Sequence, residues 1–216
     1  MSNRKDYLNT WELNELFYAL YHEPCRYQSR NIAVFEVAKY CALRVSEITH
    51  MRIDDYDPFK KTIFCNRLKG SNSNMLRIVD PNVYTALDNY LFERSKIKSP
   101  LPNLFLSQKG TPISRQRLDR LMKHYCSYTH IPCEKWHFHI LKHSRAVELA
   151  EYGFDVDDIQ YWLGHRNIQN TFVYLQYTSA LKKTMFMQLE KFEGKEGRRW
   201  KRTTQKSWAH LMKATL

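Results

Sequence analysis

The sequence predicts a mainly α-helical fold with one small antiparallel β-sheet, an α+β class. Apolar residues recur at helical spacing along most of the chain, beginning with residues 11–22. In the middle of the chain the period changes. Residues 61–68 and 74–79 have the composition and length of short strands, and the polar turn between them contains Gly70. Helical spacing then returns, so a β-hairpin is expected within a helical domain.

Capping residues and glycines set the expected boundaries of the elements. Thr10 and Ser114 are predicted N-caps, whereas Gly153 and Gly164 are predicted helix stops. The expected helices cover residues 11–22, 30–43, 82–96, 115–129, 139–152 and 156–163. A further short helix is expected to restart at Ser46 or at the bend before it.

The charge of the chain indicates an anionic partner. The 216 residues carry a net charge of +12 and a pI of about 9.5. Nucleic acid is the commonest partner of such a protein, and a membrane surface is the alternative. No apolar run approaches the roughly 18 residues of a membrane span, and the N-terminus lacks a secretion signal, so a cytoplasmic location is expected. Five cysteines without a CxxC pair indicate reduced thiols.

The C-terminal segment has a different composition from the rest. Residues 182–216 contain ten Lys or Arg and three Glu, a net +7. We interpret residues 193–216 as a basic linker followed by a short helix, whose apolar stripe needs a surface to pack against. The stripe comprises Trp208, Leu211, Met212 and Leu216.

Four motifs occur in a characteristic order along the chain. They are "CALRVSEITHMRIDD", "NRLKGSNSNMLRIV", "HILKHSR" and "LGHRNIQNTFVY", the last with a tyrosine nine residues after its histidine. This order resembles the tyrosine recombinase (phage integrase) family over roughly residues 8–192. The stretches "RLKGS", "FLSQKGTPISRQ" and "LGHRNI" are most similar to the short fimbrial-switch invertases of that family. The resemblance implies one catalytic domain over residues 1–192, with no separate N-terminal core-binding domain.

The chemistry of these residue types suits reversible cleavage of a DNA phosphodiester. A tyrosine can attack the phosphorus, form a phosphotyrosine and release a 5′-hydroxyl. Guanidinium groups stabilise the charge that builds up on the non-bridging oxygens, and a lysine can protonate the leaving oxygen. No metal or nucleotide cofactor is needed.

The resemblance implies a role for each matching residue. Tyr174 would be the nucleophile, Arg44 a clamp on the scissile phosphate, and Lys69 the general acid. His139 would exchange a proton near the tyrosine, and His165 would donate a hydrogen bond to the phosphate. Glu47 would orient Arg44 through an i,i+3 contact, and His143 would have a structural or supporting role.

Position 142 departs from the family pattern. The family places an arginine there, paired with the arginine at the position of Arg44, whereas this chain has Lys142. Lysine keeps the positive charge but lacks the planar two-donor fork, so slower cleavage is expected. Arg145, one helical turn further, is a less favoured substitute.

Two alternatives for single features remain open. Tyr177 in "YLQY" competes with Tyr174 as the nucleophile, although the spacing favours Tyr174. Residues 124–139 contain enough Cys and His to suggest zinc, but their spacing does not match a structural zinc site, so no metal is expected.

The predicted function is site-specific DNA recombination by inversion, or by integration and excision. Double-stranded DNA is the expected partner, together with a homotetramer that assembles on two DNA sites through the C-terminal helix. The alternatives are a type IB topoisomerase-like strand transferase and a catalytically weakened DNA-binding regulator of the same fold. The expected location is the cytoplasm, associated with the nucleoid and with no membrane contact.

Overall fold

The computed structural model describes residues 6–68, 70–175, 187 and 190–191. It confirms the predicted class, which is mostly helical with one small sheet. Lys69, Tyr177 and the C-terminal segment 193–216 lie outside the described residues. None of the described helices is both long enough and apolar enough to cross a bilayer.

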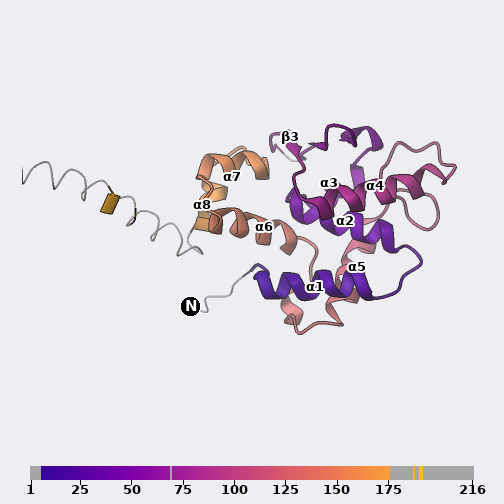
Figure 1. Cartoon of the computed structure of the whole chain (residues 1–216), viewed down its shortest axis with the longest axis horizontal. Coiled ribbons are helices and arrows are strands. Elements are labelled where there is room, and N and C mark those ends of the chain that lie inside the picture. Colours follow the sequence, from indigo (N-terminus) through magenta and orange to yellow (C-terminus); the bar gives the residue numbers. More distant parts are fainter. Residues whose placement is uncertain (1–5, 69, 176–186, 188–189, 192–216) are drawn as a thin grey trace, which may run out of the picture.

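The central helix of the fold is α2 (Gln28–Tyr40), which contacts α1 (Thr10–His22), α4 (Pro81–Ser95) and α6 (Ile140–Glu151). As Figure 1 shows, α1 and α5 (Arg115–Cys126) lie on one side of α2, and α3 (Val45–His50) and α4 lie on the other. Apolar side chains cover most of the circumference of α2, which explains its central position.

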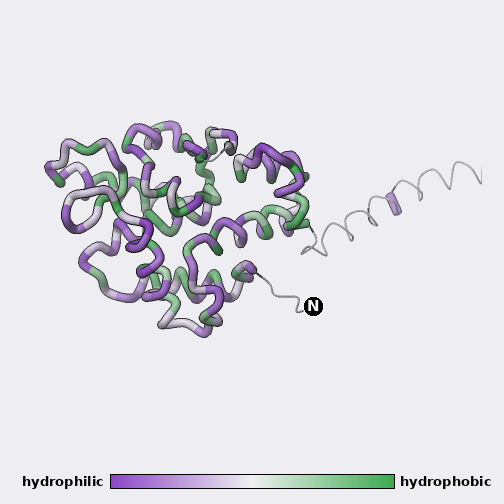
Figure 2. The backbone as a smooth tube through the Cα atoms, turned by 180° about the vertical axis from the view of Figure 1, so that it is seen from behind, coloured by the Kyte–Doolittle hydropathy of each residue, from purple (hydrophilic) through white to green (hydrophobic). Residues whose placement is uncertain are grey.

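The last three described helices form a separate group beside this centre (Figure 1). They are α6, α7 (Val156–Leu163) and α8 (Gln169–Leu175), and each contacts the other two. Their shared apolar cluster includes Ala146, Leu163 and Tyr174. Figure 2 shows hydrophobic and hydrophilic residues alternating along most of the chain, as expected where each helix buries one face.

The sheet has three antiparallel strands in the order β1 (Tyr56–Asp57), β2 (Thr62–Cys65) and β3 (Asn74–Arg77). The predicted hairpin is β2–β3, in which Ile63 pairs with Leu76 and Cys65 pairs with Asn74. Two short 3-10 turns, Ile53–Asp55 and Cys133–Lys135, complete the described elements.

Several helix boundaries differ from the sequence expectation by one to three residues; α2, for example, covers residues 28–40 and not 30–43. The N-cap of α1 is Asn9, whose side chain accepts a hydrogen bond from the backbone of Glu12 while the Glu12 carboxylate accepts one from the backbone of Asn9. Thr10, the predicted cap, is the first residue of the helix. The short helix α3 begins directly after Arg44, at the bend before Ser46, which was one of the two expected starts.

Candidate active site

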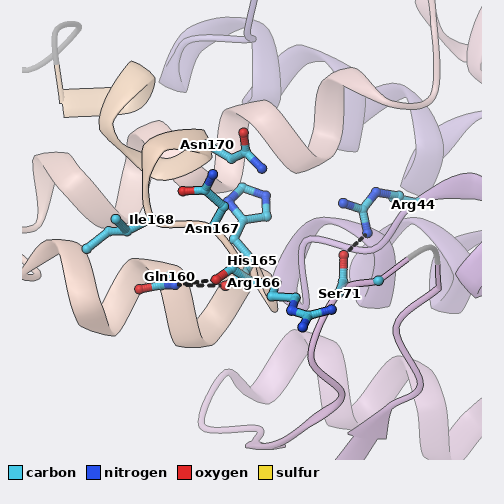
Figure 3. A pocket seen from close by; sticks show the side chains of 9 residues that line it. Arg44, Ser71, Gln160, His165, Arg166, Asn167, Ile168 and Asn170 are labelled. Carbon is cyan, nitrogen blue, oxygen red and sulfur yellow. Dashed lines mark hydrogen bonds between the residues drawn. The ribbon is translucent and has the colours of Figure 1, made fainter.

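Arg44 lies at the bend between α2 and α3. Its backbone N–H donates to Glu47 Oε2 at 2.9 Å, and its Nη1 donates to Glu47 Oε1 at 2.8 Å and to Ser71 Oγ at 3.0 Å. The predicted i,i+3 contact is therefore present. It orients the guanidinium toward the β2–β3 turn, because Ser71 belongs to that turn (Figure 3).

Glu47 is shared between two arginines. Its carboxylate also accepts from Arg67 Nη1 at 3.3 Å, and both side chains of this pair are almost fully buried. Burial alone would raise the pKa of Glu47. However, the hydrogen bond from the Arg44 backbone and the charge of Arg67 outweigh burial, so its pKa lies below the ordinary value. Glu47 is therefore charged at neutral pH and compensates the buried guanidinium of Arg67.

The carbonyl groups at the C-terminal end of α7 are capped by side chains from elsewhere in the fold. Arg67 Nη2 donates to the Trp162 carbonyl at 2.7 Å, and Lys142 Nζ donates to the Leu163 carbonyl at 3.0 Å. Cations at a helix C-terminus are favoured by the helix dipole and by its unpaired carbonyls. These bonds connect the hairpin, α6 and the turn that carries His165.

Gly164 ends α7 with a φ of +66°, as its sequence position predicted. A Cβ atom there would lie 2.6 Å from the backbone oxygen of Asn72 and 2.8 Å from the side chain of Arg67. Glycine is therefore required both for the left-handed backbone and for the close approach of the hairpin.

We expect Gly164→Ala to lower the free energy of unfolding by roughly 2 kcal/mol or more, because strain and collision combine. Gly153→Ala is the matched control. Gly153 also has a positive φ (+84°) but faces open space, so only the backbone cost of about 1 kcal/mol is expected. Urea denaturation of both variants measures the difference, and equal losses would contradict the close approach.

Lys142 occupies a buried position with 2% of its surface exposed. Burial, and then the charges of Arg67 and Arg44, lower the pKa of Lys142 to about 7. The positive charge expected from the sequence is therefore only partly held at neutral pH in the DNA-free protein. Arg145 does not point to the same place, since its guanidinium stacks on Tyr40 and Trp162 at 5.0 and 4.9 Å.

Tyr174 lies on α8 and is 5% exposed. Its hydroxyl is 2.9 Å from His143 Nδ1, and its ring stacks on that of His165 with the centroids 6.4 Å apart. His139, which was expected near the tyrosine, contacts His143 through perpendicular rings 4.7 Å apart. In this structure His143 thus takes the position beside the hydroxyl that the motif assigned to His139.

The histidines of the site are held in the neutral state. Burial, and then the positive charges around them, lower the pKa of His139 to about 4 and that of His165 to about 3. His165 Nδ1 lies 3.0 Å from Thr171 Oγ1. A neutral ring can donate from one nitrogen and accept at the other, so His165 can still donate a hydrogen bond to a phosphate oxygen.

These pKa values predict acid sensitivity of the free protein. Between about pH 6.5 and pH 4 the unfolded chain binds protons on both histidines and the folded chain does not, so the free energy of unfolding falls as the pH falls. We expect a loss of roughly 2 kcal/mol for each of these two histidines between pH 7 and pH 5, because about 1.36 kcal/mol is lost per pH unit below their ordinary pKa. It is measured by urea denaturation of the unsubstituted chain and of the His139→Gln/His165→Asn double variant.

The effect of the histidines is the difference in unfolding free energy between the unsubstituted chain and the double variant. This difference cancels the contribution of Glu36, whose pKa burial raises to about 7 and whose titration stabilises both proteins as the pH falls. A difference that stays constant over this pH range would contradict the neutral histidines.

An open pocket of about 790 Å³ lies between the β2–β3 turn and the α7–α8 turn. Figure 3 shows Arg44 on one side of it and His165 and Arg166 on the other. Among the described residues no carboxylate belongs to its lining, so the pocket suits an anion. The lining residues are Arg44, Gly70, Ser71, Gln160, His165, Arg166, Asn167, Ile168 and Asn170.

The structure therefore brings most of the predicted site residues into one region. Arg44 and His165 line the pocket, whereas Tyr174, His139, His143 and Lys142 are not among its lining residues. Lys69 is outside the described residues, but its neighbour Gly70 lines the pocket. Sequence reasoning did not identify Arg67 or Ser71. The only signal was their place in the lysine-bearing hairpin motif.

Comparison with known proteins defines the family. The sequence model of the phage integrase family matches residues 7–180. The chain is 32% identical over 178 residues to the type 1 fimbriae regulatory protein FimB of Escherichia coli K12, covering 80% of this chain and 85% of FimB. It is 30% identical over 167 residues to tyrosine recombinase XerC of Bacillus licheniformis, covering 73% of this chain and 53% of XerC.

Solved structures agree with this result. The crystal structure of XerA recombinase has a TM-score of 0.72 and 25% identity, covering 84% of this chain and 64% of XerA. The fold is also that of XerH site-specific recombinase bound to its difH substrate, with a TM-score of 0.70, 20% identity, and coverage of 86% of this chain and 51% of XerH. The chain belongs to the phage integrase family and is a tyrosine recombinase. The similarity to FimB confirms the resemblance to fimbrial members of the family.

Proposed function

We propose that the chain cleaves and rejoins DNA strands at specific sites through a 3′-phosphotyrosine on Tyr174. The observation that carries this proposal is the carboxylate-free lining of the described pocket, to which Arg44 and His165 belong, with the Tyr174 ring stacked on His165. A phosphodiester placed there would meet a guanidinium and a neutral imidazole, which are suitable donors for its non-bridging oxygens.

The proposed reaction assigns one step to each of the predicted residues. The Tyr174 oxygen attacks the phosphorus and forms the P–O bond while the bond to the 5′-oxygen breaks. Lys69 donates a proton to the departing oxygen. His143, 2.9 Å from the Tyr174 hydroxyl, accepts the phenolic proton, with His139 beside it. The neutral state of both rings supports this role, because a protonated imidazole cannot accept.

DNA binding must change the position of Tyr174. Its side chain is buried and does not belong to the pocket lining, so the hydroxyl and the phosphate have to approach each other while His143 stays within reach of the phenolic proton. The described arrangement thus corresponds to a resting state.

We further propose a homotetramer on two DNA sites, assembled through the basic segment 193–216, with residues 1–192 as the catalytic domain. The net charge of +12 and the apolar stripe of that segment support this assignment. It implies a nucleoid-associated location. XerH, Tn1549 integrase and lambda integrase, which share the fold, have been solved bound to DNA, the last as a dimer.

One observation favours a second candidate, a DNA-binding regulator with weak catalysis. Lys142 replaces an arginine of the family motif, is buried and does not line the pocket, and the relative FimB is named as a regulatory protein. A monomeric type IB topoisomerase-like activity has the same chemistry but would not need the C-terminal segment.

A recombination assay separates these candidates. The coding region is first searched for flanking inverted repeats. A supercoiled plasmid then carries two copies of the candidate site, and restriction digestion reports inversion or deletion. The proposal predicts exchange that depends on both repeats, with four protomers per synapsed pair by light scattering. Tight binding without exchange or covalent DNA would identify a regulator. Relaxation of plasmids that lack the repeats would identify a topoisomerase.

A further inference from the structure

The pocket lacks one group that the family motif implies. In that motif a second arginine, at position 142, accompanies the arginine at the position of Arg44. Here Lys142 Nζ donates to the Leu163 carbonyl at 3.0 Å, and Lys142 is not among the residues that line the pocket. Of the two motif positions, only Arg44 thus presents a guanidinium to the phosphate site.

Arg166 provides a second guanidinium at the same pocket. It directly follows His165, is exposed, and lines the pocket opposite Arg44. In Figure 3 its side chain points toward Ser71, the residue that Arg44 contacts from the other side. Among the described residues its side chain has no hydrogen-bond or ion-pair partner, so its five donors are available to a ligand.

The backbone that carries Arg166 is fixed. Gln160 Nε2 donates to the His165 carbonyl at 2.9 Å and to the Arg166 carbonyl at 3.4 Å. The preceding turn is fixed as well, because the Gly164 carbonyl accepts a hydrogen bond from Asn72 N–H at 2.9 Å. The side chain is therefore free while its Cα position is set relative to the hairpin and to His165.

In the described part of the chain, no free carboxylate of the protein lies at the pocket to pair with the Arg166 guanidinium. Within the part of the chain that the structure describes, the pocket lining contains no Asp or Glu, and the nearby buried carboxylate of Glu47 is already bonded to Arg44 and Arg67. Two guanidinium groups that face one cavity without a carboxylate repel each other in the free protein. A phosphodiester between them would relieve this repulsion and accept hydrogen bonds from both planar forks.

We propose that Arg166 is a catalytic residue that binds the scissile phosphate and supplies the guanidinium which Lys142 does not. The inference rests on the proposed function, because it assigns a further group to the same phosphate. Lys142 then has a different role. Its bond to the Leu163 carbonyl holds the end of α7, and so positions the turn that carries His165 and Arg166.

The test compares Arg166→Gln with Arg77→Gln, an exposed arginine on β3 that does not line the pocket. Single-turnover cleavage of a nicked suicide duplex is measured with protein in excess, alongside DNA affinity. We expect cleavage by Arg166→Gln to be about 10²–10³-fold slower, as for the loss of one oxyanion donor, with affinity changed only a few-fold. Arg77→Gln should cleave at the unsubstituted rate.

Two further measurements separate a phosphate contact from a structural effect. A methylphosphonate at the scissile position removes one non-bridging charge, so Arg166→Gln should recover cleavage on one stereoisomer to within about tenfold of the unsubstituted chain. Lys142→Arg added to Arg166→Gln should raise the rate at least about tenfold, because it returns a second fork.

The inference is overturned if Arg166→Gln cleaves normally, or if its loss is matched by a loss of affinity and persists on both methylphosphonate stereoisomers. Covalent cleavage by the unsubstituted chain, measured in parallel, tests the proposed function itself. Absence of that adduct would refute both, whereas a normal adduct that Arg166→Gln leaves unchanged would refute the inference alone.

Discussion

Tyr174→Phe is expected to abolish covalent attachment of the protein to DNA, lowering the rate by at least about 10⁴-fold. Removing the hydroxyl removes the nucleophile, and the phenyl ring that remains cannot form the same bond. DNA affinity should remain within a few-fold, because the ring keeps its stacking on His165. The measurement is denaturing gel electrophoresis after incubation with a nicked suicide duplex.

Tyr177→Phe is the matched control, since Tyr177 was the rival nucleophile in the sequence. It should form the adduct at a rate close to that of the unsubstituted chain. Apart from its effect on cleavage, the Tyr174→Phe variant loses the contact with His143 and so about 1 kcal/mol of unfolding free energy. An adduct that persists in Tyr174→Phe and disappears in Tyr177→Phe would reverse the assignment.

Glu47→Leu should have the largest effect on stability, lowering the free energy of unfolding by about 3–5 kcal/mol. The side chain of Glu47 is 1% exposed and that of Arg67 is 0% exposed. Removing the carboxylate leaves the charge of Arg67 buried without its partner. It also releases Arg44 from its 2.8 Å contact, so cleavage should slow even where the variant is folded.

Urea denaturation with Glu134→Leu as the control measures this effect. Glu134 is exposed, so its replacement should change stability by about 0.5 kcal/mol or less. Because the pKa of Glu47 is lowered in the folded protein, its contribution is present above the ordinary carboxylate pKa and is lost as the pH falls. A loss below about 1 kcal/mol for Glu47→Leu at pH 7 would contradict the buried pair.

The fold was predictable wherever local chemistry determines it. Ser114 caps α5 and Gly164 ends α7 as expected, because a capping oxygen or a positive φ is a property of a few adjacent residues. The two-residue strand β1 was missed, since its pairing with β2 and not its own sequence defines it. The cap at Asn9 was missed because Asn9 and Thr10 are both good capping residues.

The residues of the candidate site likewise divide into those that a local motif predicts and those whose contacts depend on the packed fold. Motif order predicted Arg44, His165 and Tyr174 as site residues, because the spacing within each motif is local. The buried environment of Lys142 was not predictable, since it depends on the carbonyl of Leu163, 21 residues further along the chain. The role of Arg67 depends on Trp162, which is 95 residues away. Only the packed fold brings such groups within hydrogen-bond distance.

The central claim is that Tyr174 forms the covalent link to DNA. The most direct measurement is peptide mapping of the trapped adduct: the protein is digested with trypsin after nuclease trimming, and the modified residue is located by tandem mass spectrometry. We expect a nucleotide joined through its 3′-phosphate to the oxygen of Tyr174. A nucleotide on Tyr177 or any other residue, or linkage through a 5′-phosphate, would contradict the claim.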